Sequence, residues 1–204
     1  MFNDNIKFVA QSIEKTPVIE KNGCYYQNFQ NFFPDYILKK LVSVDRDNSA
    51  FTTLQTQERS PRVRMEYTEH IIKEISLIFR SKSVVDVLEK KYNTLLKFDS
   101  VDIWFDYKGY RLSPHKDDTR IALALQIYLD TDESIPGTAI FDSTNVCLRR
   151  ILDTEEYYKP FQVFKYGQNN GYCLRNNEYS WHGTEFTMDN EKTRKSVYVR
   201  YERN

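Results

Sequence analysis

The chain holds only three histidines, so the residues around each one are informative. His115 stands two residues before Asp117 in the segment Leu112-Ser-Pro-His-Lys-Asp-Asp118. On an extended segment, side chains two residues apart point the same way, with Cα atoms about 6.6 Å apart. An imidazole and a carboxylate at that separation can reach one metal ion. His182, in Ser180-Trp-His-Gly183 at the end of a predicted strand, would add a second imidazole.

Two imidazoles and one carboxylate on one face of a metal leave three coordination positions open, which is the facial triad of non-haem Fe(II) oxygenases. Each part alone has a simpler interpretation. Asp and Glu make up 29 of the 204 residues, so any histidine has roughly a one-in-seven chance of an acid two residues on. A single histidine such as His182 is more often a hydrogen-bonded residue at a strand end. The triad hypothesis therefore depends on its surroundings in the chain.

A second pair of interest follows twelve residues after His182, where Arg194 and Ser196 lie two apart on a predicted strand. Side chains two apart share one strand face. A guanidinium with an adjacent hydroxyl can bind a carboxylate through charge-assisted hydrogen bonds. The alternative is an edge strand whose charges prevent aggregation.

The order of motifs over about residues 98–203 resembles that of the 2-oxoglutarate- and Fe(II)-dependent dioxygenases, nearest the prolyl-4-hydroxylase-like branch. The motifs that carry the resemblance are Tyr107-x-Gly109, Leu112, His115-x-Asp117, Ile127-Tyr-Leu-Asp130, Gly137-Thr138, His182-Gly183 and Arg194-x-Ser196. Residues 26–34 match that branch only loosely. Thr138-Ala139 after Gly137, where many relatives have a second glycine or an acid, and Asp118 after the triad depart from its pattern.

The resemblance implies a role for each matched residue. His115, Asp117 and His182 would hold Fe(II) as the catalytic metal centre. Arg194 would pair with the distal carboxylate of 2-oxoglutarate, the co-substrate, and Ser196 would assist it.

Two tyrosines would complete the co-substrate site. Tyr128, in the Ile-Tyr-Leu-Asp motif, would donate to the same distal carboxylate, and Tyr107 would lie over the co-substrate nearer the metal. Either could instead be a packed strand aromatic. The implied reaction consumes O2 and 2-oxoglutarate, releases succinate and CO2, and hydroxylates a C–H bond.

The pattern of the sequence changes near residue 97 from helical periodicity to strand-like runs. Aromatic and β-branched runs broken by turn residues predict eight short strands: 100–107, 110–115, 120–129, 137–141, 161–166, 172–175, 180–182 and 195–201. Eight strands without regular helices between them indicate a mostly β fold, a double-sheet jelly roll or double-stranded β-helix of the cupin-like kind.

The N-terminal part has helical periodicity around residues 34–42, 66–80 and 84–88. We expect these helices to pack on the outer face of one sheet. Residues 45–64 are polar and predict an exposed surface loop, with an active-site flap as the alternative. We interpret 1–204 as one domain, in which 1–96 is a helical support region and 97–204 the jelly-roll catalytic core.

Composition limits the partners and the location. Lys+Arg and Asp+Glu are both 29, and this balance disfavours a protein held on nucleic acid by bulk charge, although a local basic groove stays open. The widely spaced Cys24, Cys147 and Cys173 favour a reducing compartment. The sequence has neither a secretory signal nor an apolar run of about 18 residues, so we expect a cytoplasmic protein away from membranes.

Three functions remain open at this point. The first is hydroxylation of a peptidyl or free amino-acid side chain, with a peptide or small molecule as substrate. The second is oxidative demethylation of nucleic-acid bases, suggested by Arg194 and Arg200 and by Leu112-Ser113. The third is a non-catalytic jelly-roll binding module. The oligomeric state does not follow from the sequence.

Overall fold

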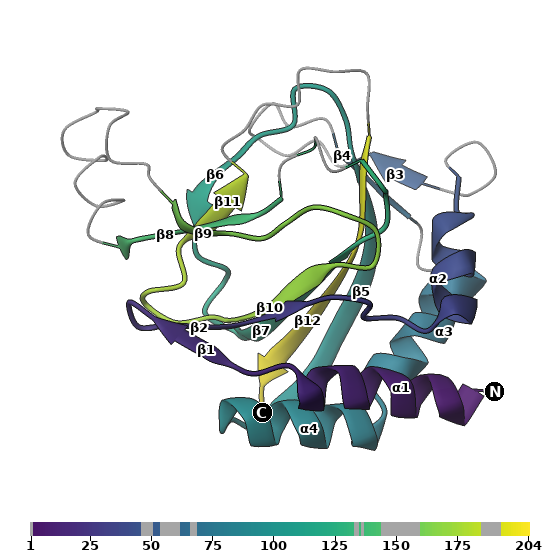
Figure 1. Ribbon diagram of the computed structural model, residues 1–204, viewed down its shortest axis with the longest axis horizontal. Coiled ribbons are helices and arrows are strands. Elements are labelled where there is room, and N and C mark those ends of the chain that lie inside the picture. Colours follow the sequence, from purple (N-terminus) through teal and green to yellow (C-terminus); the bar gives the residue numbers. More distant parts are fainter. Residues whose placement is uncertain are drawn as a thin grey trace.

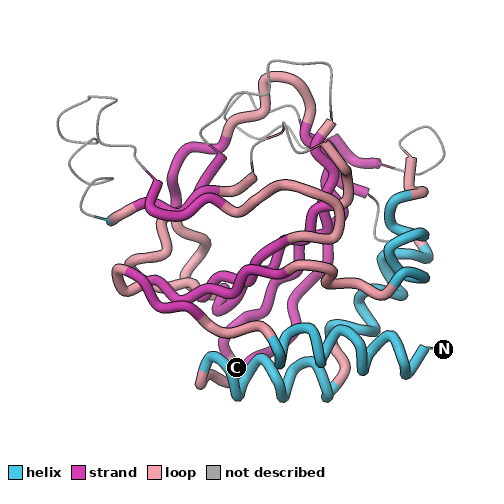
Figure 2. Tube along the Cα trace, in the orientation of Figure 1, coloured by secondary structure: helices cyan, strands magenta, loops and turns pink. Residues whose placement is uncertain are grey.

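The computed structural model describes residues 2–45, 51–53, 62–65, 69–132, 135, 137–143, 160–184 and 193–204. Within these ranges the chain forms two antiparallel sheets, and the helices gather at the larger of the two (Figures 1 and 2). The sheets hold the candidate site, and the helices support the larger sheet from the other side.

The described helices are α1 (Phe2–Lys15), α2 (Asp35–Val42), α3 (His70–Phe79) and α4 (Lys82–Tyr92). The larger sheet has the order β1 (Ile19–Lys21), β2 (Cys24–Phe29), β10 (Gly171–Arg175), β7 (Ile121–Tyr128), β12 (Arg194–Arg203), β5 (Leu96–Asp106), β4 (Arg62–Met65) and β3 (Phe51–Thr53). The smaller sheet has the order β6 (Leu112–His115), β11 (His182–Thr184), β8 (Ala139–Phe141) and β9 (Pro160–Val163).

Side-chain alternation divides the larger sheet into two different faces. On β12, Val197 and Val199 belong to the core shared with the helices, whereas Arg194, Tyr198 and Arg200 face a cavity on the opposite side. The neighbouring strands keep the same alternation because successive strand residues point to opposite faces. One sheet thus carries an apolar face toward the helices and a polar face toward the smaller sheet.

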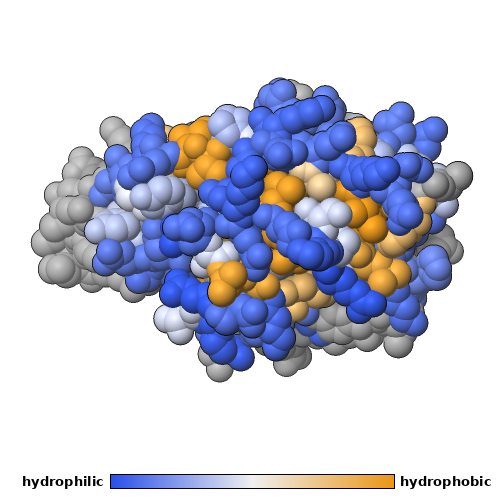
Figure 3. Space-filling view, turned by 90° about the horizontal axis from the view of Figure 1, so that it is seen from below, coloured by the Kyte–Doolittle hydropathy of each residue, from blue (hydrophilic) through white to orange (hydrophobic). Residues whose placement is uncertain are grey.

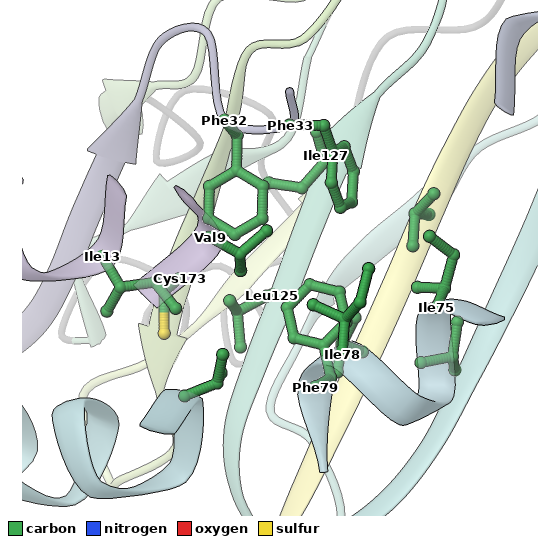
Figure 4. Packing of buried hydrophobic residues seen from close by; sticks show 14 of the residues in the cluster. Val9, Ile13, Phe32, Phe33, Ile75, Ile78, Phe79, Leu125, Ile127 and Cys173 are labelled. Atoms are coloured by element: carbon green, nitrogen blue, oxygen red, sulfur yellow. The ribbon is translucent and has the colours of Figure 1, made fainter. Parts of the chain in front are cut away.

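The core between sheet and helices is made by the apolar stripes of amphipathic helices. Val9 and Ile13 of α1 and Ile75 of α3 are fully buried, as is Leu125 of β7. Figure 4 shows side chains of α1 and α3 gathered around Leu125 and Ile127. This packing confirms that the N-terminal helices cover the outer face of one sheet.

The eight strands expected in the C-terminal half are all present, within a few residues of the predicted bounds. The exposed-loop interpretation of residues 45–64 is wrong where the structure describes it, because 51–53 and 62–65 form β3 and β4 at the edge of the larger sheet. Val63 and Met65 are buried in the core. The rest of that segment, and with it the flap alternative, lies outside the described residues.

The surface on the side of α1 and α4 is mainly hydrophilic, with separate apolar patches (Figure 3). None of the described helices combines the length and the apolar character that crossing a bilayer requires. Cys24 and Cys173 are buried free thiols, and Cys147 lies outside the described residues.

Candidate active site

The two predicted histidine ligands meet across the smaller sheet. β6 and β11 are antiparallel, with His115 directly opposite His182. Their ring centroids are 4.5 Å apart. Oδ1 of Asp117 lies 3.9 Å from Nε2 of each histidine. One potential ligand atom from each residue lies within 4.8 Å of the others, so the structure brings the three together as a possible metal site.

The hydrogen bonds of the two Nδ1 atoms determine which nitrogen of each imidazole faces the site. Nδ1 of His115 lies 3.0 Å from the Ser113 carbonyl, and Nδ1 of His182 lies 2.9 Å from the Ser180 carbonyl. A carbonyl oxygen can only accept, so each Nδ1 carries the proton. Both Nε2 lone pairs are then free to bind a metal beside the Asp117 carboxylate. This donor set, two imidazoles and a carboxylate, fits a divalent iron-type ion.

The electrostatic environment favours the neutral form of His115. Burial, with a smaller effect of the neighbouring His182, lowers the pKa of His115 to about 4. The ring is therefore neutral at neutral pH, which is the state that a metal ligand requires.

A cavity of about 400 Å³ opens from the triad between the two sheets. This volume is in the usual range for small-molecule sites. Away from the triad the cavity is lined by Arg194 and Arg62 with the rings of Trp104 and Tyr110. A cavity with two guanidinium groups is suited to an anionic ligand.

Arg194, which lines this cavity, is almost completely buried. Its Nε donates to Oδ2 of Asp106 at 2.9 Å, and Nη2 lies 2.8 Å from the same oxygen. Nη1 donates to the Thr184 hydroxyl at 3.1 Å. Burial alone would raise the pKa of Asp106, but the charges of Arg62 and Arg194 outweigh it and hold that pKa below its usual value. A charged carboxylate therefore fixes the guanidinium at the place where the sequence predicted an anchor.

Ser196 and Tyr128 lie one layer behind the cavity lining. Gln126, which lines the cavity, donates to the Ser196 hydroxyl at 2.9 Å. The Tyr128 hydroxyl accepts a hydrogen bond from the main-chain N–H of Thr138 at 2.8 Å. Both predicted residues therefore support the side chains that line this end of the cavity, and the roles assigned to them stay predictions.

Tyr107 takes a different position from the expected one. It packs against the core under the helices and is not among the cavity-lining residues. Tyr107 directly follows β5 and continues the alternation of Ile103 and Phe105, whose side chains also face the helices. Tyr110, three residues on, is the tyrosine that lines the cavity. Burial raises the pKa of Tyr110 to about 12, so its hydroxyl stays protonated.

Two arginines at another part of the cavity wall are paired with acids. Nε of Arg200 lies 3.2 Å from Asp99. Nε of Arg120 lies 3.1 Å from Asp118. Local ion pairs of this kind leave little net positive charge to attract phosphates.

Comparisons with known proteins find similarity in structure only. No protein-family model matches the chain, and no curated protein matches it. Among solved structures, HygX from Streptomyces hygroscopicus with nickel and 2-oxoglutarate bound has a TM-score of 0.62 at 10% identity, over 88% of this chain and 83% of that one.

Two further structures cover nearly the whole chain. A prolyl hydroxylase from Trichoplax adhaerens, in complex with a peptide fragment of hypoxia inducible factor, has a TM-score of 0.62 at 10% identity over 99% of this chain and 90% of that one. A 2-oxoglutarate–Fe(II) oxygenase family oxidoreductase from Burkholderia pseudomallei has a TM-score of 0.64 at 9% identity over 98% and 91%. The chain therefore has the double-stranded β-helix fold of these proteins, which confirms the fold predicted from the sequence.

Proposed function

We propose that this protein is an Fe(II)- and 2-oxoglutarate-dependent oxygenase, with His115, Asp117 and His182 as the metal ligands. The observation that carries the proposal is the orientation of the two imidazoles. Each Nδ1 is held by a main-chain carbonyl, so both Nε2 atoms are presented to the Asp117 carboxylate. When bound, the iron and the 2-oxo acid would supply the oxidising power for C–H hydroxylation, with succinate and CO2 as the other products.

The protein's own contribution is binding, orientation and exclusion of water. Arg194, aligned by Asp106 and Thr184, would bind the distal carboxylate of the co-substrate. Tyr128 would act through Thr138, which it contacts with both its hydroxyl proton and its oxygen. Such a preorganised end of the cavity holds a dicarboxylate in one direction, with its reacting end toward the triad.

For the substrate we propose a peptidyl or free amino-acid side chain. The fold shared with the peptide-bound prolyl hydroxylase supports this choice. The pairing of Arg200 with Asp99 and of Arg120 with Asp118 counts against nucleic acid, because these cations are already neutralised near the cavity. We further propose that the N-terminal part and the jelly roll act as one catalytic unit in the cytoplasm.

Anaerobic titration tests the reaction class. Addition of Fe(II) and then 2-oxoglutarate should give a weak visible charge-transfer band, and a non-catalytic module would give none. Succinate release should then be measured with peptides, free amino acids and methylated oligonucleotides. Stimulation by the oligonucleotides alone would replace the proposed substrate class with nucleic-acid bases.

A further inference from the structure

A second guanidinium reaches the end of the cavity where Arg194 lies, and it comes from the N-terminal part of the chain. Arg62 is on β4, which lies beside β5 in the larger sheet (Figure 1). In that pairing Arg62 stands opposite Asp106. Its Nη2 donates to Oδ2 of Asp106 at 3.1 Å, and its Nε bonds to Oδ1 of the same carboxylate. One buried carboxylate therefore aligns the guanidinium groups of both Arg62 and Arg194.

Two aromatic rings hold Arg62 in place. Its guanidinium carbon lies 4.6 Å from the centre of the Trp104 ring and 4.4 Å from that of Tyr110. The Arg194 guanidinium lies 5.0 Å from the same Tyr110 ring. Stacking on aromatic faces favours a planar guanidinium and restricts its rotation. Arg62 is thus fixed beside Arg194 before any ligand arrives.

The two arginines differ in how far they are open to the cavity. The Arg194 side chain is 1% exposed, whereas the Arg62 side chain is 18% exposed. Both line the cavity. Among the described residues, the Nη1 group of Arg62 has no hydrogen-bond partner. Arg62 can therefore accept a further carboxylate without giving up its bonds to Asp106.

The charged side chains around Arg62 and Arg194 also favour an anionic ligand. Arg62 and Arg194 contribute two positive charges, and Asp106 cancels one of them. A divalent ion on Asp117 would leave one more positive charge at the triad. Among these groups alone, positive charges would exceed negative charges by two, which would complement the two carboxylates of 2-oxoglutarate.

We propose that Arg62 is a second binding residue for the distal carboxylate of 2-oxoglutarate, acting beside Arg194. This inference rests on the proposed function and adds to the site a residue from β4, outside the motif-bearing half of the chain.

Calorimetry on the Ni(II)-loaded full chain tests this directly, because binding is measured without turnover. Arg62→Gln should raise the Kd for 2-oxoglutarate at least about tenfold, the size expected for loss of a charge-assisted hydrogen bond. Arg62→Lys, which keeps the charge but loses the planar fork, should have a smaller effect. Neither variant should change the affinity for Ni(II).

A second ligand separates anchoring from a structural role. 2-Oxobutanoate has the same metal-binding end but no distal carboxylate, so its Kd should be unchanged in Arg62→Gln. The matched control is Arg64→Gln, on the same strand and paired with Asp102 at 3.8 Å but not lining the cavity. It should bind 2-oxoglutarate as the wild type does.

Two results would overturn the inference: an unchanged Kd for 2-oxoglutarate, or equal weakening of both oxo acids. If Arg62→Gln does not fold, Arg62→Lys decides by the same comparison. Failure of the wild type to bind 2-oxoglutarate would remove the proposed function as well, whereas wild-type binding that is insensitive to Arg62 removes only this inference.

Discussion

The side-chain amide of Asn176 holds the main chain of Asp117, with Nδ2 3.2 Å from the Asp117 carbonyl oxygen. The same nitrogen donates to the carbonyl oxygens of Asp118 at 2.9 Å and Ile121 at 3.0 Å. The side-chain Oδ1 of Asn176 in turn accepts from the hydroxyl of Ser180, and the main-chain oxygen of Ser180 lies 2.9 Å from Nδ1 of His182. One buried amide therefore joins the two segments that carry the triad.

We expect Asn176→Ala to weaken metal binding by about 10- to 100-fold, the usual effect of losing a residue that orients metal ligands. Calorimetric titration with Mn(II) measures this. Asn177→Ala is the matched control, since the side-chain amide of Asn177 donates to the carbonyl oxygen of Gly23 rather than to the Asp117 segment. Equal losses in the two variants would show that only general stability is involved.

His182→Ala should abolish metal binding and succinate production while the fold is kept, because the substitution removes one of the three proposed ligands and leaves the main-chain pairing of β11 with β6 and β8 in place. Metal content and circular dichroism check the two halves of this expectation. His70→Ala is the control, because that histidine is exposed at the start of α3. Normal turnover by His182→Ala would refute the metal centre.

Arg194→Leu should raise the 2-oxoglutarate concentration needed for half-maximal turnover sharply while leaving metal affinity nearly unchanged. The reason is that Arg194 lines the same cavity as the triad but is held by Asp106 and is not one of the three candidate metal ligands. Titration of both ligands separates the two effects. If the co-substrate requirement did not move, another residue would be the main carboxylate anchor.

Asp106→Asn should destabilise the fold at neutral pH by about 3–5 kcal/mol, because the buried guanidinium of Arg194 and the partly buried one of Arg62 lose their counter-charge. The pKa of Asp106 is lower in the folded state than the unfolded value of about 3.9. Its contribution is therefore complete above about pH 4 and is lost as the pH falls toward the folded pKa.

Urea unfolding from pH 7 to pH 2.5 checks the sign. The wild type should lose stability below pH 4 more steeply than Asp106→Asn. Parallel curves for the two proteins would contradict a charged Asp106 in the folded state.

The eight strands could be predicted because their signals are local, whereas the triad was predicted from the order of motifs along residues 98–203. In a His-x-Asp pair on an extended segment the two side chains point the same way, and β-branched and aromatic residues indicate a short strand. Strand parity also placed Arg194 and Ser196 on one face. The pairing of His115 with His182 across β6 and β11 is long-range and became visible only in the structure.

Other site residues depend on long-range pairing that the sequence does not display. The role of Arg62 could not be predicted because it lies in a polar segment. The alternation Arg-Val-Arg-Met over four residues is only a weak strand signal. Strand alternation could have identified Asp106 as a site residue, because it places the Asp106 carboxylate on the same face as Trp104. A buried carboxylate there must have a partner. The resemblance implied a place for Tyr107 at the co-substrate, whereas the structure packs it against the core on the helix side of the sheet.

The alternation along β12 also limits how this protein can acquire new substrates. Val197 and Val199 pack the sheet against the helices, and Tyr198 between them lines the cavity on the opposite face. A tightly packed interior passes on small shifts, so repacking beneath the helices would move the side chains across the strand. Changes in specificity should therefore come from cavity-lining residues outside β12, while this strand itself changes little.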